Sequence, residues 1–300
     1  MSVLLLAAGL ALVVGGAEVF FDGLLATASR FRVSPFVLTV VVSGFEVENL
    51  AAGIAANANG LGNAAAGTFL GGTTFLALAV PGAAAIVAPL ETRLAPRALA
   101  WTAAAPLPLV ALAADGRLAR WEGAILVAWF ATAITGIARS GTAVVEASVA
   151  RLRYAPARLA LGLGLLAGAG ELLGRGIHGV VRGFGISESL LGNTAIAASV
   201  EAEEIGRVVG PARHRRADIA LANVVGTIAH FAAFNAGVIA LVRPITLDHD
   251  SRVLHLPAAG AAPLLLTVLV AWRGGIDRLL GAALVASYAA YVGVAVALAL

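Results

Sequence analysis

Two short acidic stretches decide the fold: Ser43-Gly44-Phe45-Glu46-Val47-Glu48-Asn49 and Ser199-Val200-Glu201-Ala202-Glu203-Glu204. Each lies inside a long apolar segment, and a separation of 155 residues relates Glu46 to Glu201 and Glu48 to Glu203. Matches between alanines or glycines carry little information in such a chain, whereas carboxylates inside apolar segments are rare. The recurrence of the acids therefore indicates an internal repeat.

Composition places the repeat in a membrane. Of 300 residues, 60% are hydrophobic and 12% are charged, and the mean hydropathy is +0.94. Soluble domains average about 45–50% apolar and about 25% charged residues. These values exclude a soluble enzyme and a disordered chain. They also exclude a nucleic-acid-binding protein, since the pI near 10.1 reflects a net charge of only +3. The absence of cysteine excludes disulfides and thiolate metal sites.

Hydropathy predicts an all-α membrane protein with ten transmembrane helices, because no alternating ten-residue segments typical of outer-membrane strands occur. The N-terminus has no basic region and no clear cleavage site, so the first segment is interpreted as a helix rather than a signal peptide. The expected helices span residues 3–28, 33–57, 63–90, 97–114, 120–138, 156–183, 187–209, 217–243, 254–271 and 277–299.

The repeat divides these helices into two halves of five. We expect a first half at 1–138, with its acidic repeat at about 33–90, a cytoplasmic linker at 139–155, and a second half at 156–300, with its acidic repeat at about 187–245. Five crossings are odd, so the second half enters the membrane from the opposite side, as in many secondary transporters. Fourteen of the 20 arginines, Arg207 among them, fall in the odd-numbered connections; this places that side in the cytoplasm and both termini outside.

The five acids are costly in a membrane. A charge at a helix centre costs about 2.5–3.5 kcal/mol even on a lenient scale. Arg175 and Arg182 on the adjacent segment are too few to neutralise five acids, so bound cations and protons are the economical explanation. Residues two apart point to different sides of a regular helix, and a break at Gly44 or Gly192 would free backbone carbonyls as further ligands.

Polar residues of two further segments complete the candidate site. Asn223, Thr227 and His230 share one helical stripe, and Thr68 belongs to the corresponding segment of the first half. Each threonine could instead bond to its own helix, while a buried amide needs partners. His230 is compatible with a packing role and with a proton-linked role. Glu171 and Arg175, four residues apart, predict an intrahelical ion pair.

These residues resemble the calcium/cation antiporter superfamily, which includes sodium/calcium and cation/proton exchangers. The resemblance covers nearly the whole chain and is carried by Gly44–Leu50 with Gly67–Thr73, by Glu203 with Asn223–Thr227, by Asp115–Gly123 and by Val242–Ile245. It implies ten helices in two inverted halves, one Ca²⁺-ligating glutamate from each half, and sliding of helices 1 and 6 during transport. The cation/proton signature falls on Glu48 and Glu203, whereas the sodium/calcium pattern falls on Asn49 and Glu204.

The sequence hypothesis is a secondary antiporter that exchanges a cation, Ca²⁺ first, for H⁺ by alternating access. Glu48 and Glu203 are the expected central ligands, and Glu46, Glu201 and Glu204 are further ligands or proton carriers. The expected polar shell is Asn49, Thr68, Asn223 and Thr227, with His230 beside it. Na⁺/Ca²⁺ or Na⁺/H⁺ exchange is the alternative, and a passive channel or an intramembrane metalloenzyme is more distant. The expected partners are inorganic cations and the lipid bilayer, with no resident cofactor.

Overall fold

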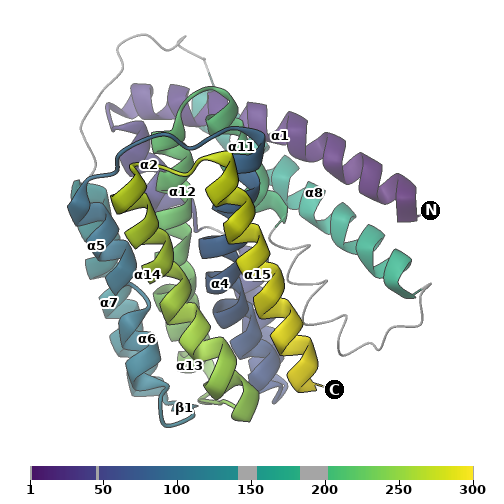
Figure 1. Ribbon diagram of the computed structural model, residues 1–300, viewed down its shortest axis with the longest axis vertical. Coiled ribbons are helices and arrows are strands. Elements are labelled where there is room, and N and C mark those ends of the chain that lie inside the picture. The colour runs from purple at the N-terminus through teal and green to yellow at the C-terminus, as the bar shows by residue number, and fades with distance from the viewer. Residues whose placement is uncertain (1, 45–46, 141–153, 183–201, 300) are drawn as a thin grey trace.

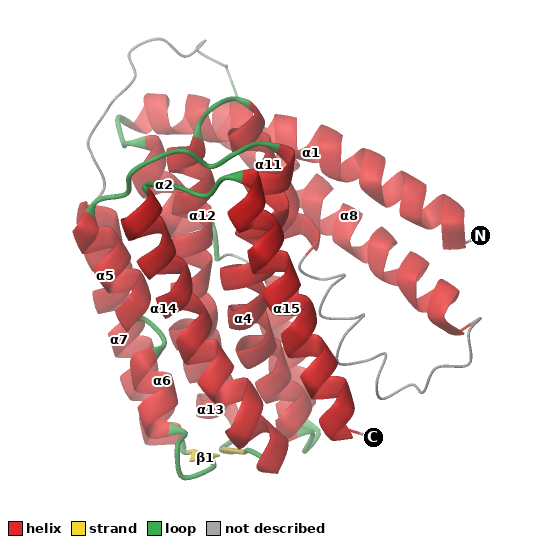
Figure 2. Cartoon of the chain, viewed as in Figure 1, coloured by secondary structure: helices red, strands yellow, loops and turns green. Residues whose placement is uncertain are grey.

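The computed structural model describes residues 2–44, 47–140, 154–182 and 202–299. This part of the chain is a helical bundle with one pair of two-residue strands (Figures 1 and 2). The elements are α1 (Ser2–Phe31), α2 (Pro35–Val42), α3 (Val47–Ala58), α4 (Gly62–Val87), α5 (Pro96–Ala104), α6 (Leu107–Leu112), β1 (Arg117–Leu118), α7 (Arg120–Ser140), α8 (Ala155–Arg182), α11 (Ala202–Arg213), α12 (Ala217–Ala229), the π-helix η2 (His230–Asn235), α13 (Ala236–Val242), β2 (Ile245–Thr246), the π-helix η3 (Ser251–His255), α14 (Leu256–Arg273) and α15 (Arg278–Ala299).

Six helical stretches within the described residues are long and apolar enough to cross a membrane. They are Ala7–Phe31, Gly62–Val87, Arg120–Ser140, Ala217–Val242, Ser251–Arg273 and Arg278–Leu298. The expected helix at 33–57 is interrupted after α2, and the one at 97–114 is divided at Pro106, which has no N–H to donate. Of the expected helix at 187–209, residues 187–201 lie outside the described residues.

The repeat is visible in the helix bounds. Helices α3 and α11 end 155 residues apart, at Ala58 and Arg213. Helix α4 contains 26 residues, and the continuous stretch Ala217–Val242 also contains 26 residues and begins 155 residues later. The second stretch contains the π-helix η2, which the first lacks. The two halves therefore use the same element lengths at the separation that the acids predict.

Two short backbone pairings also correspond. Leu118 of β1 pairs with Ile245 of β2, and Leu90 forms an isolated bridge with Ile276. Leu90 and Ile245 are again 155 residues apart. The strand pair lies at one end of the bundle, and the loops that follow α4 and α14 lie at the other end (Figure 1). Equivalent connections thus lie at opposite ends.

Burial separates central from peripheral helices. α4 and the α12–α13 stretch are the most buried of the candidate spans, and α15 is the least buried. Apolar residues of α15 such as Leu279 and Val294 face outward, as expected for contact with lipid. Helices α1 and α8 pack along each other and cross the remaining helices obliquely (Figures 1 and 2). The centre of the bundle, where α12 packs against both α2 and α11, contains the polar residues described next.

Candidate ion-binding site

A helix break opens the site. Ser34 caps the start of α2 by accepting a hydrogen bond from the Val37 amide, and α2 ends at Val42. Ser43 and Gly44 form a turn before α3 begins at Val47. The Ser43 carbonyl lies 2.9 Å from Nη1 of Arg207 and 3.2 Å from Oγ1 of Thr227. The break expected at Gly44 is present, and the carbonyl beside it accepts hydrogen bonds from other helices.

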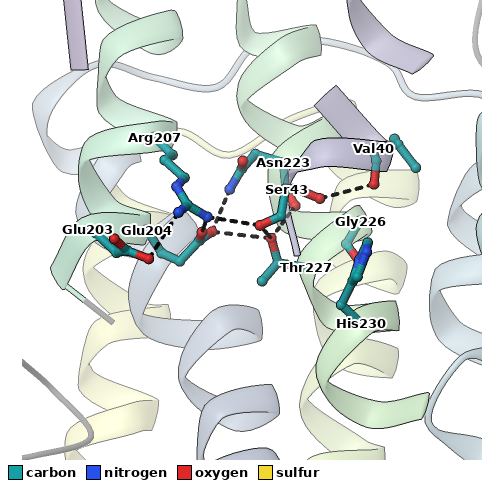
Figure 3. Close-up of polar contacts among 9 residues, drawn as sticks. All are labelled: Val40, Ser43, Glu203, Glu204, Arg207, Asn223, Gly226, Thr227 and His230. Atoms are coloured by element: carbon teal, nitrogen blue, oxygen red, sulfur yellow. Dashed lines mark hydrogen bonds and ion pairs between the residues drawn. The ribbon is translucent and has the colours of Figure 1, made fainter. Parts of the chain in front are cut away.

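Two carboxylates and a guanidinium lie opposite this carbonyl. Glu203 and Glu204 occupy the first turn of α11, and Arg207 lies one turn further on. Their exposed fractions are 2%, 0% and 2%. Arg207 Nη1 donates to Glu204 Oε1 at 2.5 Å, and Arg207 Nη2 donates to Glu203 Oε1 at 3.0 Å. The guanidinium therefore bridges both acids and the Ser43 carbonyl (Figure 3).

Helix α12 supplies the third side. Asn223 Nδ2 donates to Glu204 Oε2 at 2.5 Å. The Thr227 hydroxyl lies 3.2 Å from the same carboxylate oxygen, 3.2 Å from the Ser43 carbonyl and 2.9 Å from the Asn223 carbonyl, so its single proton serves one of three acceptors at a time (Figure 3). Asn223 Oδ1 is fully buried and accepts no hydrogen bond from the residues that the structure describes. A buried oxygen of this kind is a candidate ligand for a cation or a water molecule.

His230 lies one turn further along. Its Nδ1 is 2.9 Å from the Gly226 carbonyl, and its ring packs edge-on against Phe130 with centroids 4.5 Å apart. The ring also lies directly against the backbone of Gly44. Of the two roles left open by the sequence, these contacts favour packing.

Other predicted residues lie apart from this cluster or beyond the description. The Thr68 hydroxyl donates to the Ala65 carbonyl of its own helix at 2.7 Å, as the local alternative predicts. Asn49 is buried in the first turn of α3. Glu48 belongs to the same turn by its backbone, while its side chain, together with Glu46 and Glu201, lies outside the described residues.

Arg207 corrects the sequence analysis. The sequence places it among the arginines of a cytoplasmic connection and leaves bound ions to balance the acids, whereas in the structure Arg207 is buried and neutralises one acid charge. Its spacing of four residues from Glu203 and three from Glu204 is that of an intrahelical ion pair, so the signal was available. The same spacing correctly predicted the exposed Glu171–Arg175 pair, whose atoms are 2.5 Å apart.

The described residues contain no group of three His, Asp or Glu side chains placed to hold a metal ion. The oxygen atoms gathered at the break are instead of mixed type: carboxylate, amide, hydroxyl and backbone carbonyl. This mixture is typical of sites for hard cations.

Comparison with known proteins assigns the family. A family model described as sodium/calcium exchanger protein matches residues 1–138 and 154–297. The chain belongs to the sodium/calcium exchanger family. A relative from Alkalimonas amylolytica, named as the antiporter CaxA, is 26% identical over 94% of this chain and 95% of its own length. The fold matches that of the sodium-calcium exchanger NCX_Mj soaked with Na⁺ and Sr²⁺, with a TM-score of 0.84 and 20% identity over 97% of both chains. The same exchanger soaked with Na⁺ and Ca²⁺ gives a TM-score of 0.83 at 21% identity.

Membership in the sodium/calcium exchanger family confirms the resemblance seen in the sequence. The chain is an all-α integral membrane protein of an antiporter family, a transporter rather than an enzyme, and its substrates are inorganic cations.

Proposed function

We propose that the protein exchanges Ca²⁺ for H⁺ across the membrane by alternating access. The observation that carries the proposal is the set of oxygen atoms at the break between α2 and α3, where Glu204, Asn223, Thr227 and the Ser43 carbonyl meet with almost no exposure to solvent. Hard divalent cations prefer carboxylate, amide and carbonyl oxygens. Glu48 and Glu203 are the proposed central ligands, one from each half.

The remaining predicted residues complete this proposal. Glu46, Glu201 and Glu204 serve as further ligands or proton carriers, and Asn49, Asn223 and Thr227 contribute neutral oxygens. Thr68 and His230 serve as packing residues around the site, in keeping with their hydrogen bonds to the Ala65 and Gly226 carbonyls of their own helices. The buried Oδ1 of Asn223 supports a ligand at the cluster, since buried polar atoms are normally satisfied.

Competition between protons and Ca²⁺ for the same carboxylates couples the transport of the two ions. A buried carboxylate is stabilised by a proton or by a shared cation, and either form costs less in the membrane than the bare anion. Release of protons therefore favours binding of Ca²⁺, and the reverse. Gly44-Phe45-Glu46 and Gly71-Gly72-Thr73 stand where the sodium/calcium signature has small polar ligands, and this favours H⁺ over Na⁺ as the counter-ion.

The proposed architecture remains ten transmembrane helices in two inverted halves, with the linker at 139–155. This arrangement is supported by the separation of 155 residues between the ends of α3 and α11 and by the two 26-residue stretches at the same separation. The placement of equivalent connections at opposite ends also supports it. Removing Arg207 from the arginine count leaves 13 in the odd-numbered connections, still most of the 20. Both termini are thus proposed to lie outside the cell.

The test is Ca²⁺ uptake into proteoliposomes under a proton gradient and, separately, under a sodium gradient. Uptake driven by protons and lost in Glu48→Gln and Glu203→Gln is the expected result. Glu171→Gln, which removes an acid from an exposed pair, is the matched control and should retain uptake. Uptake driven only by sodium would establish the Na⁺/Ca²⁺ alternative, and the absence of coupled uptake would overturn the proposal.

A further inference from the structure

We propose that Arg207 is a fixed cation of the transport site, which takes the place of one exchangeable monovalent cation. The inference rests on the proposed function in one respect, namely that the cluster at the helix break binds transported cations. It adds that one positive charge in this cluster is covalently attached and is never exchanged.

The contacts of the guanidinium are those of a bound cation. It donates to one oxygen each of Glu203, Glu204 and Ser43, at 3.0, 2.5 and 2.9 Å. The Ser43 carbonyl belongs to the first half of the chain, whereas both carboxylates belong to the second. Arg207 therefore joins the two halves through the backbone oxygen at a helix break, the position where discontinuous helices commonly coordinate a monovalent ion.

Comparison of the two halves shows that Arg207 and Glu204 are both charged residues at positions where the first half has neutral ones. At the separation of 155 residues, Glu203 corresponds to Glu48, Glu204 to Asn49, and Arg207 to Ala52. Glu204 and Arg207 bond to each other while fully buried, so the extra carboxylate is balanced by its own cation. Without Arg207, that carboxylate would need a mobile cation or a proton.

A monovalent cation bound at this position would exchange with the ions in solution, whereas the guanidinium of Arg207 is covalently attached and cannot leave. Arg207 is always charged, so its contribution to the site is also independent of pH over the physiological range. The wild-type protein should therefore be indifferent to Na⁺ and K⁺ at this position, and removing the guanidinium should create a demand for one of them.

The experiment measures thermal unfolding of the purified protein in detergent, with choline replaced by Na⁺ or by K⁺ at constant ionic strength. The wild type is expected to show no change in Tm. Arg207→Gln is expected to gain a saturable rise in Tm of about 3 °C or more with one of the two ions. The double variant Glu204→Asn with Arg207→Ala reproduces Asn49 and Ala52 of the first half and is expected to lose this response, because the extra carboxylate is gone as well.

Several results would overturn the inference. A rise in the Tm of the wild type with Na⁺ or K⁺, or a folded Arg207→Gln variant that responds to neither ion, would each do so. If Arg207→Gln gives no folded protein, the wild type and the double variant decide, since a monovalent response in either contradicts a fixed cation. Failure of the proposed function has a different signature: wild-type liposomes without proton-driven Ca²⁺ uptake, whatever the Tm values are.

Discussion

The imidazole of His230 lies so close to Gly44 that a β-carbon at position 44 would overlap the ring. The contact joins the turn after α2 to the first residue of the π-helix η2. One turn earlier, a β-carbon on Gly226 would overlap the Ser43 hydroxyl. The two glycines therefore allow the broken end of α2 to approach α12, and this approach brings the Ser43 carbonyl within reach of Thr227 and Arg207.

Gly44→Ala is expected to lower the stability of the protein and abolish transport. Overpacking of a tight core typically costs about 1–3 kcal/mol, and a β-carbon at position 44 would force the His230 ring or the backbone to shift. Adding His230→Ala to Gly44→Ala removes the overlap and should recover most of the Tm. Thermal unfolding of the single and double variants measures this coupling.

Gly293→Ala is the control for the loss of a helical glycine. Gly293 is exposed on α15, and a β-carbon there meets nothing within 4 Å among the described residues. Alanine at such a position is expected to be neutral or slightly stabilising. If Gly44→Ala behaves like Gly293→Ala, the close contact with His230 is not a constraint on the fold.

Glu204→Gln is expected to destabilise the protein by about 3–5 kcal/mol, because it removes one partner of a buried ion pair and leaves Arg207 less compensated. The NH2 group of the new amide would also face a donor, either the Asn223 amide or the guanidinium. Glu171→Gln breaks an exposed pair and should change stability by less than about 1 kcal/mol. Equal changes in Tm for the two variants would contradict the importance assigned to burial.

The sequence predicted the all-α membrane class because the length of apolar segments is a local signal. The break at Gly44 and the gathering of Asn223 and Thr227 around an acid were also predictable, since a buried amide must find partners. The role of Arg207 was missed because an arginine near a helix end was counted as a topology signal. The Ser43–Arg207 contact joins residues 164 positions apart, and it depends on the packing of both α2 and α11 against α12.

Thr227→Val is expected to weaken Ca²⁺ uptake about fivefold while leaving the protein folded. The hydroxyl lies within hydrogen-bond distance of three acceptors, the Ser43 carbonyl, Glu204 Oε2 and the Asn223 carbonyl. Loss of one such hydrogen bond costs about 1 kcal/mol. Thr227→Ser retains the hydroxyl and should transport Ca²⁺ at close to the wild-type rate. Initial rates over a range of Ca²⁺ concentrations measure the effect, and a loss in Thr227→Ser without a loss in Thr227→Val would indicate that the methyl group matters instead of the hydroxyl.

Two acidic residues of α1 contact side chains of other helices and turns. Glu18 Oε2 lies 2.7 Å from His214 Nε2 in the turn between α11 and α12, whereas Asp22 Oδ2 lies 2.7 Å from Arg158 Nη2 of α8. His214 also stacks on Phe21 of α1, with ring centroids 4.8 Å apart. The first pair therefore links α1 to the part of the protein that bears the site, and the second links α1 to the helix that packs along it.

If α1 and α8 move together during alternating access, the Glu18–His214 contact is the one of these two pairs that would break in each cycle. Glu18→Gln is then expected to change the maximal rate of Ca²⁺ uptake by up to about fivefold, because an exposed pair contributes at most about 1 kcal/mol to one of the two states. Asp22→Asn removes an equally exposed acid from the α1–α8 pair and should leave the rate unchanged. A large change with Asp22→Asn and none with Glu18→Gln would show that α1 moves against α8 rather than with it.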